Sequence, residues 1–237
     1  MLVRVFFLIA LLVCNSNSSS LESSSTPQDA LDLEVVTLDS QGNPAKTVYY
    51  SYDQLLTLPL VTVKTERDPN TSKPATYTGI YISNLFEAFG ADAALDVIGA
   101  KCSDGRKQYY DPEYVAKHRP ILLLKFDGKS PSEWPSTENG SWLGPYCVVH
   151  ESFSPMDTVY GYSEEPRSAP AVGSIELTSL AQSLGRFTPK KSSNDQEVVK
   201  GQKIAVGSCI SCHKYGNAGG QKAGSSWEVL KRARYDF

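Results

Sequence analysis

The chain has little excess charge, few methionines and no hydrophobic run long enough to cross a membrane. Its 23 lysines and arginines nearly balance 26 aspartates and glutamates, which leaves a net charge of −3. This balance provides no basic footprint and argues against nucleic acid as a partner. The apolar run 5–13 is far shorter than the about 20 residues of a transmembrane helix. No internal repeat is visible. A length of 237 residues corresponds to one or two globular domains.

The N-terminus has the composition of an export signal. Arg4 precedes the apolar run 5–13, which has the length of a signal-peptide core, and serines and asparagines follow it. We therefore expect residues 1–20 to be a signal peptide and the protein to be periplasmic. Cys14 ends the run, where bacterial lipoproteins carry an acylated cysteine. Lipid attachment to a membrane at Cys14 and ordinary cleavage a few residues later, which gives a soluble protein, both stay open. Residues 21–32 are predicted to be a Ser-rich tether.

The pattern of apolar residues indicates the α+β fold class. Alternation and short apolar runs predict strands at 33–39, 46–52, 60–66, 95–101, 120–128, 144–152 and 172–180. Helical spacing predicts short helices at 51–59, 81–91 and 111–118. Ser51 is a possible cap of the first helix, and Gly90 stops the second. These elements make up one domain, residues 33–185. The charged stretch 186–196 is predicted to be a linker, and a further helix is expected within 195–213.

The sequence Cys-Ile-Ser-Cys-His at 209–213 carries the clearest chemistry. Two thiols at this spacing on one helical turn match the two vinyl groups of haem, to which they add as thioethers. His213 then lies under the ring and can give an imidazole nitrogen to the iron. A thioredoxin-like pair is disfavoured because no βαβ unit is visible, and zinc because no second pair of ligands follows. We therefore expect haem c, held covalently by Cys209 and Cys212 with His213 as axial metal ligand.

The stretch 201–220, GQKIAVGSCISCHKYGNAGG, resembles the start of a class I cytochrome c. The resemblance implies an all-α cytochrome c domain at 197–237 that is apparently incomplete. The family supplies a methionine or histidine as sixth ligand from further along the chain. Here Met1 and Met156 are the only methionines, and no histidine follows His213. Three explanations stay open: a fragment of a longer protein, a five-coordinate iron, or a ligand from the first domain. The candidates for that ligand are His118, His150 and Met156.

The domain at 33–185 resembles the sulfite-oxidase-type molybdopterin fold in short pieces. Tyr77, Gly79 and Ile82 stand where that family has an aromatic residue, a glycine and an aliphatic residue at the start of a helix. The stretches 102–114, 118–128 and 144–152 follow in the order of the later part of that fold.

The domain differs from that family at the position of the molybdenum ligand. In that family the cysteine that ligates molybdenum precedes the aromatic residue and the glycine, but the stretch 61–70 contains none. Thr65 and Glu66 stand in that neighbourhood, and Cys102 lies on the wrong side of the motif. The resemblance therefore implies a descendant of the fold that binds no molybdenum, and molybdopterin is not expected as a cofactor.

Two further groups of residues leave alternatives open. Cys102 and Cys147 would form a disulfide outside the cytosol, or they are two buried small hydrophobic residues. Four charged residues either line a small pocket or are solvated around a turn: Asp104, Arg106, Asp111 and Glu113.

The sequence as a whole predicts an exported c-type cytochrome that carries electrons through its haem to or from a periplasmic redox protein. It is an electron carrier rather than a catalyst on this interpretation. One alternative is a molybdopterin-dependent oxidoreductase subunit that passes substrate electrons to its own haem. Another is a sensor or binding module with five-coordinate haem.

Overall fold

The computed structural model describes residues 20–137, 140–159, 161–187 and 196–223. The predicted export signal with Cys14, residues 188–195 of the predicted linker and residues 224–237 of the predicted cytochrome domain lie outside the described residues.

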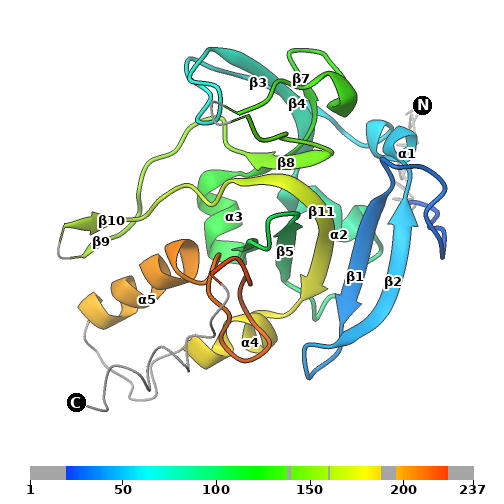
Figure 1. Ribbon diagram of the computed structural model, residues 1–237. Helices are drawn as coiled ribbons and strands as arrows, with labels where there is room; N and C mark the ends of the chain where they lie inside the picture. Colours follow the sequence, from blue (N-terminus) through cyan, green and yellow to red (C-terminus); the bar gives the residue numbers. More distant parts are fainter. Residues whose placement is uncertain (1–19, 138–139, 160, 188–195, 224–237) are drawn as a thin grey trace, which may run out of the picture.

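Nine strands of the described residues form one mixed sheet (Figure 1). Seven of them have the order β2-β1-β11-β8-β7-β4-β3, while β5 pairs with β11 and β6 pairs with β5. Their bounds are β1 (Leu33–Leu38), β2 (Pro44–Tyr50), β3 (Val61–Thr65), β4 (Ala75–Tyr81), β5 (Val97–Cys102), β6 (Lys107–Tyr110), β7 (Ile121–Phe126), β8 (Tyr146–Val149) and β11 (Ala169–Thr178). Two short strands, β9 (Thr158–Val159) and β10 (Tyr162–Ser163), pair separately.

The ten-residue strand β11 joins the parts of this sheet. It runs parallel to β1 and antiparallel to β5 and β8. Ile175 has Val35 of β1 on one edge and Ala100 of β5 on the other. Its register shifts between Val172 and Ser174, and Figure 1 shows the strand strongly curved. A shift of this kind increases local bending, so one strand serves two differently oriented parts of the sheet.

The first and third helices each begin at a capping side chain. Ser51 forms a capping box at α1 (Tyr52–Leu56), and the Asp111 side chain accepts the N–H of Tyr114 at α3 (Pro112–His118). Gly90, after α2 (Ile82–Ala88), has a φ of 59°. The remaining helices are α4 (Leu180–Ser183), α5 (Gln196–Ser208) and two 3-10 turns, η1 (Pro131–Glu133) and η2 (Gly185–Phe187). Within the described residues, none of these helices has the length and apolar character needed to cross a membrane.

The α+β class is thereby confirmed. Of the two roles expected for Cys102 and Cys147, a disulfide or two buried small hydrophobic residues, the structure has the second. Cys102 belongs to a buried apolar cluster with Tyr110 and Tyr146, whereas Cys147 belongs to another cluster with Tyr77. Both are free thiols, 3% and 1% exposed. They therefore act as small hydrophobic residues and do not pair.

Gly79 explains one element of the motif at 77–82. A Cβ at this position would lie 2.1 Å from the carbonyl oxygen of Leu122 on β7. The register between β4 and β7 shifts at the same place. Only glycine permits such a close approach of two main chains.

The stretch predicted to be a tether differs from that expectation. Leu21 donates its N–H to the carbonyl of Ala88 at 2.9 Å, and Ser24 exchanges two main-chain hydrogen bonds with Tyr49 of β2. The hydroxyl of Tyr146 donates to the carbonyl of Leu31 at 2.5 Å. Residues 20–32 therefore lie along the mixed domain.

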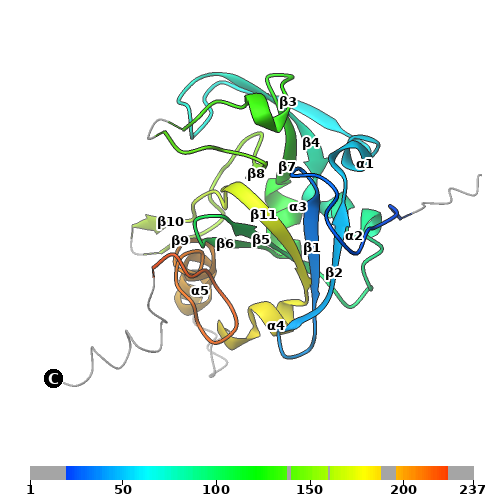
Figure 2. The ribbon, with the colours of Figure 1, turned by 45° about the vertical axis from the view of Figure 1, so that its right-hand side comes forward.

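In both ribbon views α5 and the segment after it also lie beside the β5–β6 part of the sheet (Figures 1 and 2).

Candidate functional site

The two cysteines and the histidine of the 209–213 motif follow the last residue of α5 in a single turn. Cys209 donates its N–H to the carbonyl of Ala205 at 2.9 Å, which continues the helix. The N–H groups of Cys212 and His213 both point to the carbonyl of Cys209, at 3.2 and 3.0 Å. All three side chains are half-buried, and both cysteines are free thiols. The structure thus brings the three predicted residues together on one turn.

The donor set fits covalently bound haem. Burial and the neighbouring Cys212 raise the pKa of the Cys209 thiol, so it is protonated at neutral pH. Both thiols remain partly accessible, and the imidazole of His213 directly follows them. This is the chemistry that attachment through two thioethers and one nitrogen ligand requires.

The apolar side of this turn packs on the mixed domain. Val206 and Ile210 form a buried cluster with Val97, Tyr109 and Leu184, which come from β5, β6 and the end of α4. Phe187 packs against this cluster, and its ring centroid lies 5.2 Å from that of Tyr215. The helix that carries the motif is therefore anchored in part by Val97 and Tyr109, which lie at least 97 residues earlier in the sequence.

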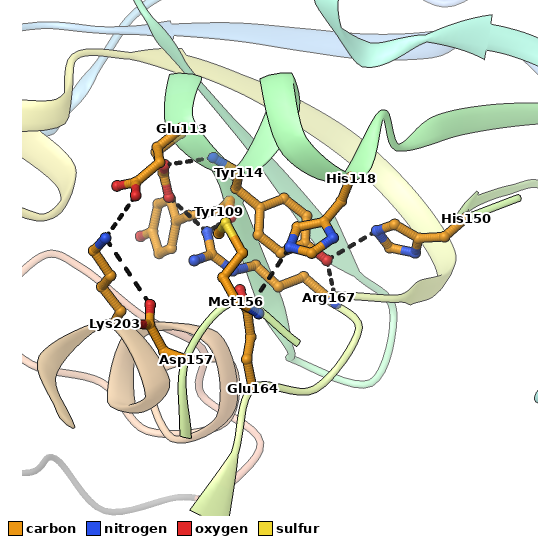
Figure 3. Close-up of polar contacts among 11 residues, drawn as sticks. Tyr109, Glu113, Tyr114, His118, His150, Met156, Asp157, Glu164, Arg167 and Lys203 are labelled. Atoms are coloured by element: carbon orange, nitrogen blue, oxygen red, sulfur yellow. Dashed lines mark hydrogen bonds and ion pairs between the residues drawn. The ribbon is translucent and has the colours of Figure 1, made fainter. Parts of the chain in front are cut away.

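The three candidates for a sixth ligand lie together in a buried polar network of the mixed domain (Figure 3). His118 Nε2 is 3.3 Å from Oε2 of Glu164, and the two side chains are 2% and 3% exposed. His150 Nε2 is 2.9 Å from the hydroxyl of Tyr114. The N–H of Met156 donates to Oε2 of Glu164 at 2.9 Å. Both imidazoles are thus engaged within their own domain.

The two imidazoles of this network are held neutral. Burial lowers the pKa of His150 to about 3, and the positive charge of Arg167 acts in the same direction with a smaller effect. Burial also lowers the pKa of His118, and the Glu164 carboxylate opposes this effect. A neutral imidazole in an apolar surrounding is the expected result of desolvation.

Arg167 is the centre of the network, and no sequence pattern indicated it because it follows a loop without periodicity. Its Nη1 donates to Oδ2 of Asp111 at 2.6 Å and to the carbonyl of Tyr109 at 2.8 Å. Its guanidinium lies 4.0 Å from the centre of the Tyr114 ring. A Cβ built on Gly207 would lie 3.4 Å from its Nε. Arg167 therefore links α3, β6 and α5.

The four charged pocket candidates divide between two cavities. Asp111 and Glu113 line a cavity of about 750 Å³ between α3, α4 and α5, together with Leu184 and Val206. Asp104 and Arg106 line a more polar cavity of about 650 Å³. These two form an ion pair of 2.8 Å around the turn at Gly105, whose φ is 86°. Both volumes lie within the range of about 300–1,000 Å³ that ligand pockets have.

The residues where the resemblance places molybdenum do not fit that metal. Thr65 lines a cavity of about 190 Å³ with Tyr77 and His150, and the described residues around it include no cysteine. Glu66 is exposed. Burial raises the pKa of Cys102 to about 12 and raises that of Cys147 as well, and neither thiol lines this cavity. A thiolate is the form that binds metals.

The comparisons with known proteins assign the chain to no family. No protein-family model and no curated protein matches the chain. A solved structure with similarity is the sulfane dehydrogenase SoxCD from Paracoccus pantotrophus, at 13% sequence identity and a TM-score of 0.38. The alignment covers 62% of this chain and 38% of that chain, so this chain corresponds to well under half of the SoxCD chain's length. This similarity is too low to transfer a site or an activity.

Proposed function

We propose that the protein is an exported c-type cytochrome that transfers electrons through a haem bound covalently at Cys209 and Cys212, with His213 as axial ligand. The observation that carries the proposal is the turn after α5, which presents two free, half-buried thiols and an imidazole in consecutive order. When bound, the haem supplies a one-electron iron couple.

The residues of the chain have distinct tasks in this proposal. Cys209 and Cys212 would hold the haem through two thioethers, each of which forms when an S–H adds across a vinyl group and nothing is released. His213 would give a ring nitrogen to the iron. Val206 and Ile210 fix the turn on the mixed domain through their buried contacts. The mixed domain is accessory, and no step of substrate chemistry is assigned to it.

Export and the partner belong to the same proposal. Covalent attachment of haem takes place outside the cytosol, which agrees with the export signal inferred for residues 1–20. We place the protein in the periplasm, soluble or lipid-anchored at Cys14, with another periplasmic redox protein as its electron partner.

Absorption spectroscopy of purified variants tests the proposal. The protein is produced in a bacterial periplasm together with the haem-ligation machinery, and haem per polypeptide is measured after denaturation in alkaline pyridine. We expect one haem per polypeptide in the wild type. In Cys209→Ala and Cys212→Ala, we expect no haem that is attached through two thioethers. Cys102→Ala, which removes a thiol from the core, is the matched control and retains the haem. A wild-type protein without haem contradicts the proposal. Stoichiometric molybdenum together with haem in the wild type supports the oxidoreductase alternative instead.

A further inference from the structure

The segment that follows the motif is held by the edge of the mixed domain. The N–H of Lys107 on β6 donates to the carbonyl of Ser211 at 2.9 Å, inside the motif itself. The N–H of Gln221 donates to the carbonyl of Gly105, in the turn between β5 and β6, at 2.7 Å. Main-chain hydrogen bonds thus fix both ends of the stretch 211–221 to the same turn and strand. Lys222 adds an ion pair to Asp104 at 2.8 Å.

Tyr109 contacts this stretch between its two ends. The side chain is 2% exposed, and its hydroxyl accepts the N–H of Gly219 at 2.9 Å. Burial raises the pKa of Tyr109, so the hydroxyl stays protonated. On its other side, the carbonyl of Tyr109 accepts from Arg167 (Figure 3). The buried network therefore fixes the position of Tyr109, and the Tyr109 hydroxyl in turn fixes the loop at Gly219.

Gly219 and Gly220 return the chain onto the cysteine turn. Gly219 has a φ of 90°, and a Cβ there would lie 2.2 Å from the carbonyl oxygen of His213. A Cβ on Gly220 would lie 1.9 Å from the carbonyl oxygen of Ser211. The N–H of Gly220 donates to the carbonyl of Ile210 at 2.8 Å. The loop fixed by Tyr109 is thus in direct main-chain contact with the turn that carries the thiols.

We infer that Tyr109 is a positioning residue for the haem site and that the β5–β6 edge of the mixed domain forms one of its walls. This inference rests on the proposed function. By holding Gly219, Tyr109 keeps the stretch 214–220 against the Cys209–His213 turn and limits the access of water to the haem. Less water around the iron disfavours the more highly charged ferric state and raises the reduction potential. The mixed domain therefore tunes the electron carrier without touching a substrate.

The test compares Tyr109→Phe with Tyr146→Phe. Each variant removes one buried hydroxyl and one hydrogen bond to the main chain, to Gly219 in the first and to Leu31 in the second. The reduction potential of the haem is measured by redox titration, and amide hydrogen exchange is measured on the protein as purified. A buried N–H without its partner is unfavourable, so we expect exchange in 214–220 to become about ten-fold faster in Tyr109→Phe. We also expect its potential to fall, and Tyr146→Phe to change neither quantity.

The outcomes separate this inference from the proposed function. Unchanged exchange and potential in Tyr109→Phe overturn the positioning role, and so do equal changes in both variants. Wild-type protein without haem overturns the proposed function, while the exchange comparison still tests whether Tyr109 holds the loop. Faster exchange with an unchanged potential overturns the claim that the loop controls the haem.

Discussion

The ion pair between Arg167 and Asp111 gives the sharpest prediction of stability. The two side chains are 4% and 15% exposed, and Nη1 lies 2.6 Å from Oδ2. Arg167→Met leaves the carboxylate of Asp111 and the carbonyl of Tyr109 without this donor. Removing one partner of a buried pair destabilises a protein by about 3–5 kcal/mol. We expect a loss of that size in the free energy of unfolding.

Arg106→Met is the matched control for this measurement. It also removes an arginine from an aspartate, but the side chains of Arg106 and Asp104 are 28% and 34% exposed. Exposed pairs contribute roughly 0–1 kcal/mol. Urea unfolding measures both variants, and with an m-value of about 2 kcal/mol per M the midpoint of Arg167→Met falls by roughly 2 M. Equal losses in the two variants would refute the reasoning. A double-mutant cycle with Asp111→Asn isolates the coupling energy of the buried pair.

Three further predictions follow from the same contacts. Gly219→Ala clashes with the main chain of the cysteine turn and lowers the haem content. The control Gly128→Ala, at a φ of 77° with open space around it, retains the haem. Equal haem contents in the two variants would contradict the contact at Gly219. Since burial lowers the pKa of His150 to about 3, the unfolded state binds the additional proton, so between pH 6.5 and 3 stability falls by up to about 1.4 kcal/mol per pH unit. His150→Gln flattens this dependence in urea unfolding from pH 4 to 7, and an unchanged slope would exclude His150 as its source. His118→Gln leaves the absorption spectrum of the haem unchanged, because Glu164 engages that imidazole; loss of a low-spin band would instead make it the sixth ligand.

Periodicity and caps predicted the regular elements well, and long-range contacts explain what they missed. Strand β1 and helix α1 were recognisable because alternation and the Ser51 cap are local signals. Strand β6 was missed because its sequence, KQYY, shows no alternation; it is buried by α5 and the loop after it. Strand β4 was missed because the motif at 77–82 was interpreted as the beginning of a helix.

The candidate site was predictable only where its residues are close in sequence. Cys209, Cys212 and His213 form one turn, so their spacing was sufficient to predict that they lie together. Arg167 meets its partner Asp111 across 56 residues, and no local pattern announces such a pair. The same holds for Tyr109, whose partner Gly219 is 110 residues away. Residues 21–32 were interpreted as a tether because the hydrogen bonds of their main chain leave no trace in composition.

Mass spectrometry of one tryptic peptide tests the central claim most directly. Cleavage after Lys203 and Lys214 releases residues 204–214, IAVGSCISCHK, which contain both cysteines and the histidine. In protein matured with the haem-ligation machinery, we predict this peptide at its own mass plus one haem, with no free thiol left to alkylate. The same peptide found only without haem, as two alkylated cysteines or as an internal disulfide, would contradict the account.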